Sequence, residues 1–160
     1  MAATQKPIRD SELIEAVLTA SRVLVAVAAR SLAEHEAEIS LQQYRALVVI
    51  ASRGPQRPVD LAEALGVDPS TITRLCDRLI VKRLILRNHQ ADDRRQVQVT
   101  LSSQGRKIVQ SVADCRRVEI GKILSSLSSG ERVRIVRAFE TFARAAGEIP
   151  EEAWPRSWDL

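Results

Sequence analysis

Hydrophobic positions between residues 60 and 101 change their period along the chain. Up to Leu65 the apolar residues recur at the spacing of a helical face, and Gly66 then supplies the residue that a tight turn between two helices requires. After a second helical segment, residues 96–101 alternate polar and apolar side chains, which is typical of a half-buried strand. The pattern therefore predicts a helix, a turn, a second helix and a two-stranded hairpin.

The second helix of this motif is predicted from Pro69 to about Lys82. Asp68 can cap its first turn, and Pro69 suits the first helical position because its missing N–H would be unpaired there anyway. The inward face is apolar and holds Ile72, Leu75, Cys76 and Leu79. The outward face is mostly polar and holds Ser70, Thr73, Arg74, Asp77, Arg78 and Val81.

Short hydroxyls and two arginines one turn apart can reach base edges and phosphates in a DNA major groove. The alternative is a solvated helix face, on which Arg74 would make local ion pairs with Asp77 worth roughly 0.3–0.5 kcal/mol each. The helix by itself leaves both interpretations open.

The following hairpin favours the DNA-binding interpretation. Residues 84–87 and 96–101 are short β-prone runs, and the loop between them carries Arg94 and Arg95 at its tip. A hairpin with paired arginines directly after a helix-turn-helix is a wing, and its arginines suit the narrow, electronegative minor groove beside the recognition helix. The alternative, a solvated polar loop, does not explain the order and compact spacing of the two motifs.

These residues resemble the MarR family of winged helix-turn-helix transcriptional regulators. The resemblance is carried by Leu65-Gly66-Val67 in the turn, by Ser70-Thr71-Ile72-Thr73-Arg74-Leu75 and Asp77-Arg78-Leu79 in the recognition helix, and by Asp93-Arg94-Arg95 leading to Leu101-Ser102 and Gly105. The chain departs from the family at Arg83, where a glycine is usual, and at Ser102, where a threonine is usual. Neither departure falls on a position that contacts DNA in the family.

The resemblance implies a mainly α fold with a small β-hairpin wing, in which a winged helix-turn-helix is flanked by N- and C-terminal dimerisation helices. It assigns DNA binding to Ser70, Thr71, Thr73, Arg74 and Arg78 on the recognition helix and to Asp93, Arg94 and Arg95 on the wing. In the family, a D-x-R motif places its arginine in the minor groove while the aspartate orients it. Asp93 with Arg95 matches this motif, and Asp92 with Arg94 is a second, shifted match, so the register stays open.

Amphipathic segments flank the motif on both sides. A helix from about Ser11 to Ala33 carries an apolar stripe longer than one small domain can cover, which suggests contact with another subunit. Ser102 can cap a helix that runs to about Ser126, and Ser128 with Glu131 forms a capping box for a last helix. We therefore divide the chain into a flexible arm (1–9), dimerisation helices (10–39 and 102–149), the winged helix-turn-helix (40–101) and a tail (150–160).

Within the winged region, Ser40 with Gln43 forms a capping box that opens a core helix ending near Arg53. In the family the terminal helices intertwine as a homodimer, and a palindromic operator requires two recognition helices about 34 Å apart. The tail, with Trp154 and Trp158, is expected either to cap the dimer interface or to be disordered.

Charge is distributed unevenly along the chain. The whole sequence has a formal net charge of +4, whereas residues 68–107 alone contain nine Lys or Arg against four Asp, a net charge of +5. The positive excess therefore coincides with the predicted recognition helix and wing, as phosphate binding would require.

Several other classes of function are disfavoured. The start of the chain has no secretion signal and no stretch approaches 18 uninterrupted apolar residues, so we expect a cytoplasmic protein with no membrane contact. Phosphate-binding loops, G-x-S-x-G and H-E-x-x-H motifs are all absent, which argues against an enzyme, and nothing suggests a cofactor. His35 lies among Glu34, Glu36 and Glu38, which we interpret as a solvated helix end and not a metal site.

The remaining candidates concern cysteines and an effector. Cys76 and Cys115 lie on apolar stripes and are expected to be buried structural residues. Tyr44 lies near the junction where phenolic effectors of the family bind, but we predict a packed aromatic there and not a ligand contact. The sequence thus predicts a homodimeric regulator, a repressor of transcription, that binds double-stranded DNA and is released by a small aromatic or phenolic effector. The alternative is a winged-helix module for protein interaction, against which the retained arginines argue.

Overall fold

The computed structural model of the chain describes residues 8–34, 39–89 and 97–155 and is mainly helical with one hairpin. Its elements are α1 (Asp10–Ala33), α2 (Leu41–Arg53), α3 (Pro58–Leu65), α4 (Pro69–Val81), β1 (Ile85–His89), β2 (Val97–Leu101), α5 (Ser103–Ser125), α6 (Ser129–Ala145) and the 3-10 turn η1 (Glu151–Ala153). The predicted fold class is confirmed.

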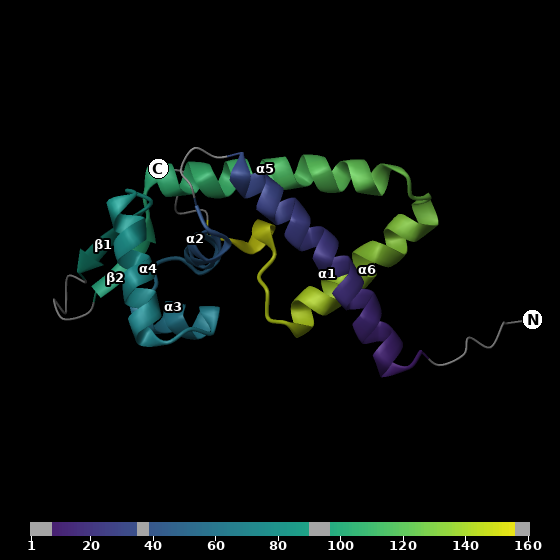
Figure 1. Ribbon diagram of the computed structural model, residues 1–160, viewed down its shortest axis with the longest axis horizontal. Helices are drawn as coiled ribbons and strands as arrows, with labels where there is room; N and C mark the ends of the chain where they lie inside the picture. Colours follow the sequence, from purple (N-terminus) through teal and green to yellow (C-terminus); the bar gives the residue numbers. More distant parts are fainter. Residues whose placement is uncertain (1–7, 35–38, 90–96, 156–160) are drawn as a thin grey trace, which may run out of the picture.

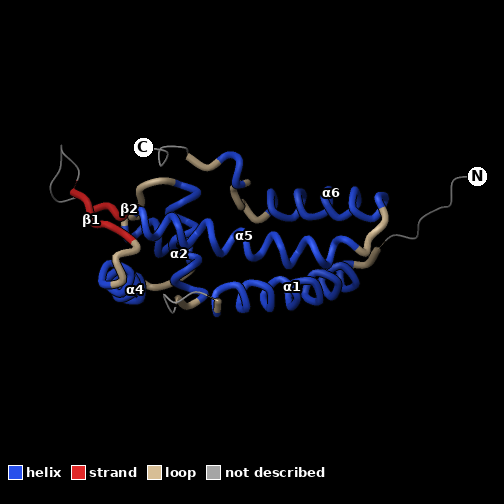
Figure 2. The backbone as a smooth tube through the Cα atoms, turned by 90° about the horizontal axis from the view of Figure 1, so that it is seen from above, coloured by secondary structure: helices blue, strands red, loops and turns tan. Residues whose placement is uncertain are grey.

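The elements form two lobes, one toward each end of the molecule. Helices α2, α3 and α4 gather with the β1–β2 hairpin at one end of the molecule, and α5 extends from this winged lobe toward the other end (Figure 1). Seen from above, α5 lies between α1 on one side and α6 on the other (Figure 2). The winged lobe is therefore compact, whereas α1, α5 and α6 form an extended helical lobe.

An aliphatic core holds the winged lobe together. Leu47 of α2, Leu61 of α3 and Leu79 of α4 are fully buried, and Val99 of β2 closes the core beneath the hairpin. The predicted inward face of the second motif helix is buried at all four of its positions, Ile72, Leu75, Cys76 and Leu79. Burial of such side chains, at about 25 cal/mol per Å² of apolar surface, fixes the rotation of α4 about its axis. Its polar face must therefore point outward.

The hairpin is antiparallel, with Ile85 opposite Leu101 and His89 opposite Val97. Gln56, in the loop before α3, adds a third paired segment because its N–H donates to the Val99 carbonyl at 3.0 Å and its carbonyl accepts from the Val99 N–H at 2.8 Å. The first strand begins one residue later than the sequence predicted. Leu84 is instead used to close the end of α4, since its N–H donates to the Leu79 carbonyl at 2.9 Å.

Side-chain caps mark the starts of α2, α5 and α6. The predicted capping boxes of Ser40 with Gln43 and of Ser128 with Glu131 are both present, at the starts of α2 and α6. Ser102 caps α5, as predicted, by accepting a hydrogen bond from the Gly105 N–H at 2.9 Å. Each of these residues satisfies backbone donors that a helix leaves unpaired in its first turn.

One junction joins the recognition helix, the wing and α5. Arg83, directly after α4, has a left-handed backbone with a φ of 57°, a conformation that costs a non-glycine residue about 1 kcal/mol. The Ser102 hydroxyl donates to the Arg83 carbonyl at 2.6 Å, and the Ser102 N–H donates to the Leu84 carbonyl at 3.0 Å. The two departures from the family pattern, Arg83 and Ser102, are therefore bonded to each other.

Some expectations need correction, and others fall outside the described residues. Cys76 is buried as expected, but Cys115 is only half-buried on α5 because it lies where α5 has left the core of the winged lobe. In the described part of the tail, residues 150–155, Trp154 packs against the core of the winged lobe, so this part is ordered, contrary to the second of the two expectations. Residues 1–7 of the arm predicted at 1–9, His35 and Trp158 lie outside the described residues.

Gly105→Ala should severely destabilise the protein, because a Cβ at this position would lie 2.0 Å from the Leu84 carbonyl oxygen, a backbone atom that cannot move aside. We expect a loss of about 3 kcal/mol or more in the free energy of unfolding, which corresponds to a fall in Tm of roughly 10 °C. Gly130→Ala is the control, since its nearest neighbour would be the flexible end of Arg134 at 3.9 Å. Thermal melts followed by circular dichroism compare the two variants, and equal Tm values would refute the steric argument.

Candidate nucleic-acid interface

One carboxylate organises the first turn of α4. Asp68 Oδ1 accepts hydrogen bonds from the Thr71 N–H at 2.9 Å and from the Ser70 hydroxyl at 2.6 Å, while Oδ2 accepts from the Thr71 hydroxyl at 2.7 Å. These bonds favour the ionised carboxylate and hold the pKa of Asp68 well below its ordinary value. The helix end that would approach DNA is thus fixed before any ligand binds.

The predicted hydroxyls of α4 all donate to the helix itself. Besides Ser70 and Thr71, the Thr73 hydroxyl donates to the Pro69 carbonyl at 2.9 Å. With their protons engaged in this way, the three oxygen atoms are left to accept hydrogen bonds. Such acceptors suit the exocyclic amino groups that cytosine and adenine present in the major groove.

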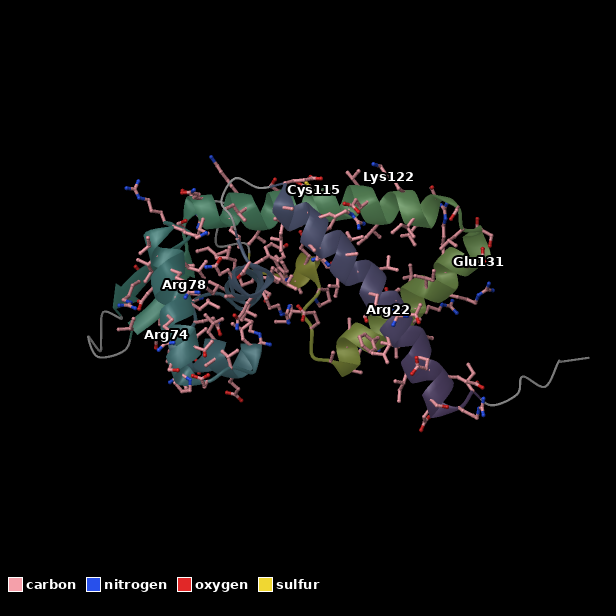
Figure 3. The ribbon with its side chains drawn as sticks, in the orientation of Figure 1. Arg22, Arg74, Arg78, Cys115, Lys122 and Glu131 are labelled. Carbon is pink, nitrogen blue, oxygen red and sulfur yellow. The ribbon has the colours of Figure 1, made fainter. Side chains whose placement is uncertain are left out.

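Arg74 and Arg78 are exposed and lie one helical turn apart on the same side of α4 (Figure 3). Within the described part of the chain, neither guanidinium takes part in an ion pair. Together with Thr71 they line a hollow of about 200 Å³ between α4 and the start of α2, where Ser40 lies. A positively charged hollow beside a helix N-terminus is suited to an anionic backbone.

Asp77 does not neutralise Arg74, which was the alternative that the sequence left open. Its carboxylate instead pairs with Arg87 of β1 at 3.2 Å. Both side chains are about half exposed, so the pair contributes at most about 1 kcal/mol. Its effect is positional, because it ties the recognition helix to the first strand of the wing and leaves the two arginines of α4 available.

The wing is described at its base. Asn88 Nδ2 donates to the Thr100 hydroxyl oxygen at 2.9 Å across the two strands, and the hairpin projects from the end of the winged lobe (Figure 2). The predicted wing residues Asp93, Arg94 and Arg95 lie outside the described residues. The structure therefore brings together five of the eight predicted site residues, all of them on α4.

Within residues 8–34, 39–89 and 97–155, no group of three or more His, Cys, Asp or Glu side chains is arranged to hold a metal ion. None of the helices described there combines the length and the apolar character needed to cross a membrane.

A family model, related sequences and solved structures all match this chain. The model of the MarR family matches residues 39–97, from α2 to the second strand of the wing. The structure of Rv1404 from Mycobacterium tuberculosis has a TM-score of 0.81 and 37% identity, over 91% of this chain and 100% of that one. The repressor MdtR of Bacillus subtilis is 32% identical over 103 residues, which cover 62% of this chain and 66% of MdtR.

The chain belongs to the MarR family. A further MarR family structure, from Bacillus stearothermophilus, has the same fold with a TM-score of 0.79 at 21% identity, over 89% of this chain and 100% of that one. The MarR family consists of helix-turn-helix transcriptional regulators and not of enzymes. This MarR-family chain is accordingly a DNA-binding regulator of transcription.

Sequence reasoning missed how the MarR-family recognition helix is held in place. The cap at Asp68 was predicted, but its bonds to the Ser70 and Thr71 hydroxyls were not, although the run Asp68-Pro69-Ser70-Thr71 contains every group involved. The pair of Asp77 with Arg87 has no comparable signal, because ten residues and a change of secondary structure separate its partners.

Asp68→Ala should lower the Tm by a few degrees at pH 7, because it removes the cap and three hydrogen bonds from the start of α4. The folded-state pKa of Asp68 is depressed, so its stabilising contribution is present above the unfolded pKa of about 4 and is lost as the pH falls below it. The difference between wild type and variant in urea midpoint should therefore shrink between pH 7 and about pH 3. Asp77→Ala serves as the control with little effect, and a pH-independent difference would contradict the capping argument.

Proposed function

We propose that this protein is a sequence-specific repressor that binds a palindromic operator as a homodimer. The observation that carries the proposal is the outward face of α4, where Arg74 and Arg78 have no ion-pair partner among the described residues and stand beside a rigidly capped helix start. The sign of regulation is supported by relatives named as repressors, MdtR and NicR of Pseudomonas putida, which is 31% identical over 94 residues.

Exposed apolar surface on the helical lobe supports the homodimer. α6 has no buried residue, and its Val133, Val136, Phe139 and Phe142 are each between 45% and 54% exposed. Leu13, Ile14 and Leu18 of α1 are similarly exposed. Apolar surface of this extent on helices from both ends of the chain is unfavourable in water, and a second copy that presents the same surface would cover it.

The dimer also determines the form of the operator. A two-fold axis through the helical lobe relates the two copies of α4, and two recognition helices about 34 Å apart read two half-sites of opposite orientation. The wing residues Asp93, Arg94 and Arg95 would then reach the minor groove that flanks each half-site. In this proposal Arg95 enters the groove, Asp93 orients its guanidinium, and Arg94 lies nearer the phosphates.

Sedimentation equilibrium at micromolar concentration should give twice the chain mass of 17.8 kDa. The double variant Val136→Asp/Phe139→Asp should shift the equilibrium to the monomer, because two charges cannot be buried in an apolar interface without a large desolvation cost. Val81→Asp is the matched control, since Val81 is 82% exposed on α4, away from α6. A wild-type chain that sediments at 17.8 kDa would refute the dimer.

Arg74→Ala should weaken binding to a palindromic duplex selected by the wild-type chain by about 1–3 kcal/mol, with a much smaller effect on random DNA. Arg95→Ala should cost much of the same affinity while leaving the Tm unchanged, because a wing tip lies outside the core. Arg22→Ala, on α1 far from α4 (Figure 3), removes the same charge and controls for nonspecific attraction. Binding isotherms at several salt concentrations measure all three variants.

Two results would change this assignment. If Arg94→Ala weakened binding and Arg95→Ala did not, the wing motif would begin at Asp92 and not at Asp93. If the wild-type dimer showed no salt-dependent binding to any duplex, the winged lobe would be a protein-interaction module, which is the alternative function.

We also propose that an anionic aromatic ligand regulates DNA binding from the junction of α2 and α5. Arg116 Nε is buried and has no hydrogen-bond partner within the described residues. Neighbouring Tyr44 is 5% exposed, and burial raises the pKa of its phenol while Arg116 lowers it. The Tyr44 hydroxyl already interacts with this guanidinium, and a carboxylate that reached Arg116 Nε would satisfy the donor that is left. Salicylate should therefore raise the Tm of the wild type more than that of Arg116→Met, and an equal rise in both would exclude this site.

A further inference from the structure

The segment that follows α6, residues 147–155, returns to the winged lobe, and we call it the strap. Gly147 has a φ of 70°, a left-handed conformation that reverses the chain at the end of α6. The strap then runs to η1, which lies beside α2 as the yellow segment in Figure 1. It therefore adds a further connection between the helical lobe and the winged lobe, besides the passage from α1 to α2 and the start of α5.

Ion pairs attach the strap to both lobes. Arg45 of α2 makes a two-pronged contact with Glu148, with Nη1 to Oε1 at 3.0 Å and Nη2 to Oε2 at 2.7 Å. This contact lowers the pKa of Glu148 below its usual value. Arg117 of α5 pairs with Glu151 of η1. The strap is thus bonded both to α2, in the winged lobe, and to α5, which leads from the winged lobe into the helical lobe.

An aromatic side chain anchors the end of the strap. Trp154 packs against the core of the winged lobe, and its Nε1 donates to the Ile149 carbonyl at 3.0 Å, so the strap is folded on itself as well as docked. Pro155 lies over Gly54, at the end of α2, where a Cβ would approach its Cγ to 4.0 Å. Pro155 and Gly54, together with Leu101 and Arg106, line an open hollow of about 190 Å³ at the junction of the wing and α5.

No residue of α6 is buried against its own chain, so apolar packing within one chain contributes little to the position of α6. In a homodimer, which this inference assumes, the partner subunit would hold α6, and the strap would transmit that position to the winged lobe of the same chain. If the winged lobe could rotate freely relative to the dimer, this freedom would be lost when both recognition helices bind DNA. The lost entropy would weaken the affinity for the operator. A strap that holds the winged lobe in position before DNA binds would remove this entropic cost.

We propose that the strap positions the winged lobe relative to the dimer, so that the two recognition helices are set at the spacing of the operator half-sites. Glu148 and Trp154 are positioning residues in this proposal, since neither touches DNA. The strap should matter only when both half-sites are occupied, because a single winged lobe can bind one half-site in any orientation of the dimer. Its loss should also make the protein tolerant of altered half-site spacing.

The test uses charge reversal with rescue in the full-length protein. Glu148→Arg and Arg45→Glu each turn the attraction into repulsion, and the double variant restores an ion pair with the partners exchanged. Each single variant should bind the selected palindromic duplex about tenfold more weakly or worse, keep its affinity for a single half-site, and discriminate less between the palindrome and versions with one or two base pairs inserted at its centre. The double variant should recover both affinity and discrimination.

The matched control is Glu119→Arg, which disrupts the exposed pair with Arg30 between α1 and α5 and changes the net charge by the same amount as Glu148→Arg. Equal losses on full palindrome and half-site, or wild-type behaviour of both single variants, would overturn the proposal. Sedimentation equilibrium of each variant checks that it is still a dimer. If repulsion itself disrupts the dimer, Trp154→Ala is the deciding variant with the same three duplexes. Failure of the wild type to dimerise or to bind the palindrome would refute the proposed function and not the strap alone.

Discussion

The close approach of the α5 backbone to the Leu84 carbonyl is the contact on which the rest of this structure depends. Ser102 donates its N–H to that carbonyl, and Gly105 passes it without a side chain. Because Leu84 also closes the end of α4, the recognition helix, the wing and the helix leading to the second lobe are fixed at one point. Any displacement of α5 therefore changes the direction of the surface that meets DNA.

This junction contains a strained residue. Arg83 holds a left-handed backbone at a cost of about 1 kcal/mol relative to glycine, and its carbonyl accepts from the Ser102 hydroxyl that also caps α5. The hydroxyl thus satisfies two backbone groups from separate elements. The bonds around Arg83 hold the chain in this conformation, so the strain persists in the folded protein.

Local sequence signals predicted most of the fold and the recognition helix. The cap at Asp68, the capping boxes and the periodicity of α4 act over three or four residues, and each was confirmed. The ion pair of Asp77 with Arg87 and the partial exposure of Cys115 depend on how distant elements meet, so no local pattern encodes them. The docking of Trp154 was missed for the same reason, because a tryptophan in a short tail has several surfaces to pack against.

The two lobes are stabilised in different ways, and this difference explains how they can work together. The winged lobe buries its apolar side chains within one chain, so its packing does not depend on a second subunit. The helical lobe leaves the apolar faces of α1 and α6 exposed, so its geometry depends on what covers them. A rigid lobe attached to an adaptable one moves as a unit when the adaptable lobe changes. The regulation that we propose, by a ligand at the junction, would then require no change inside the DNA-binding surface, only a change in its orientation.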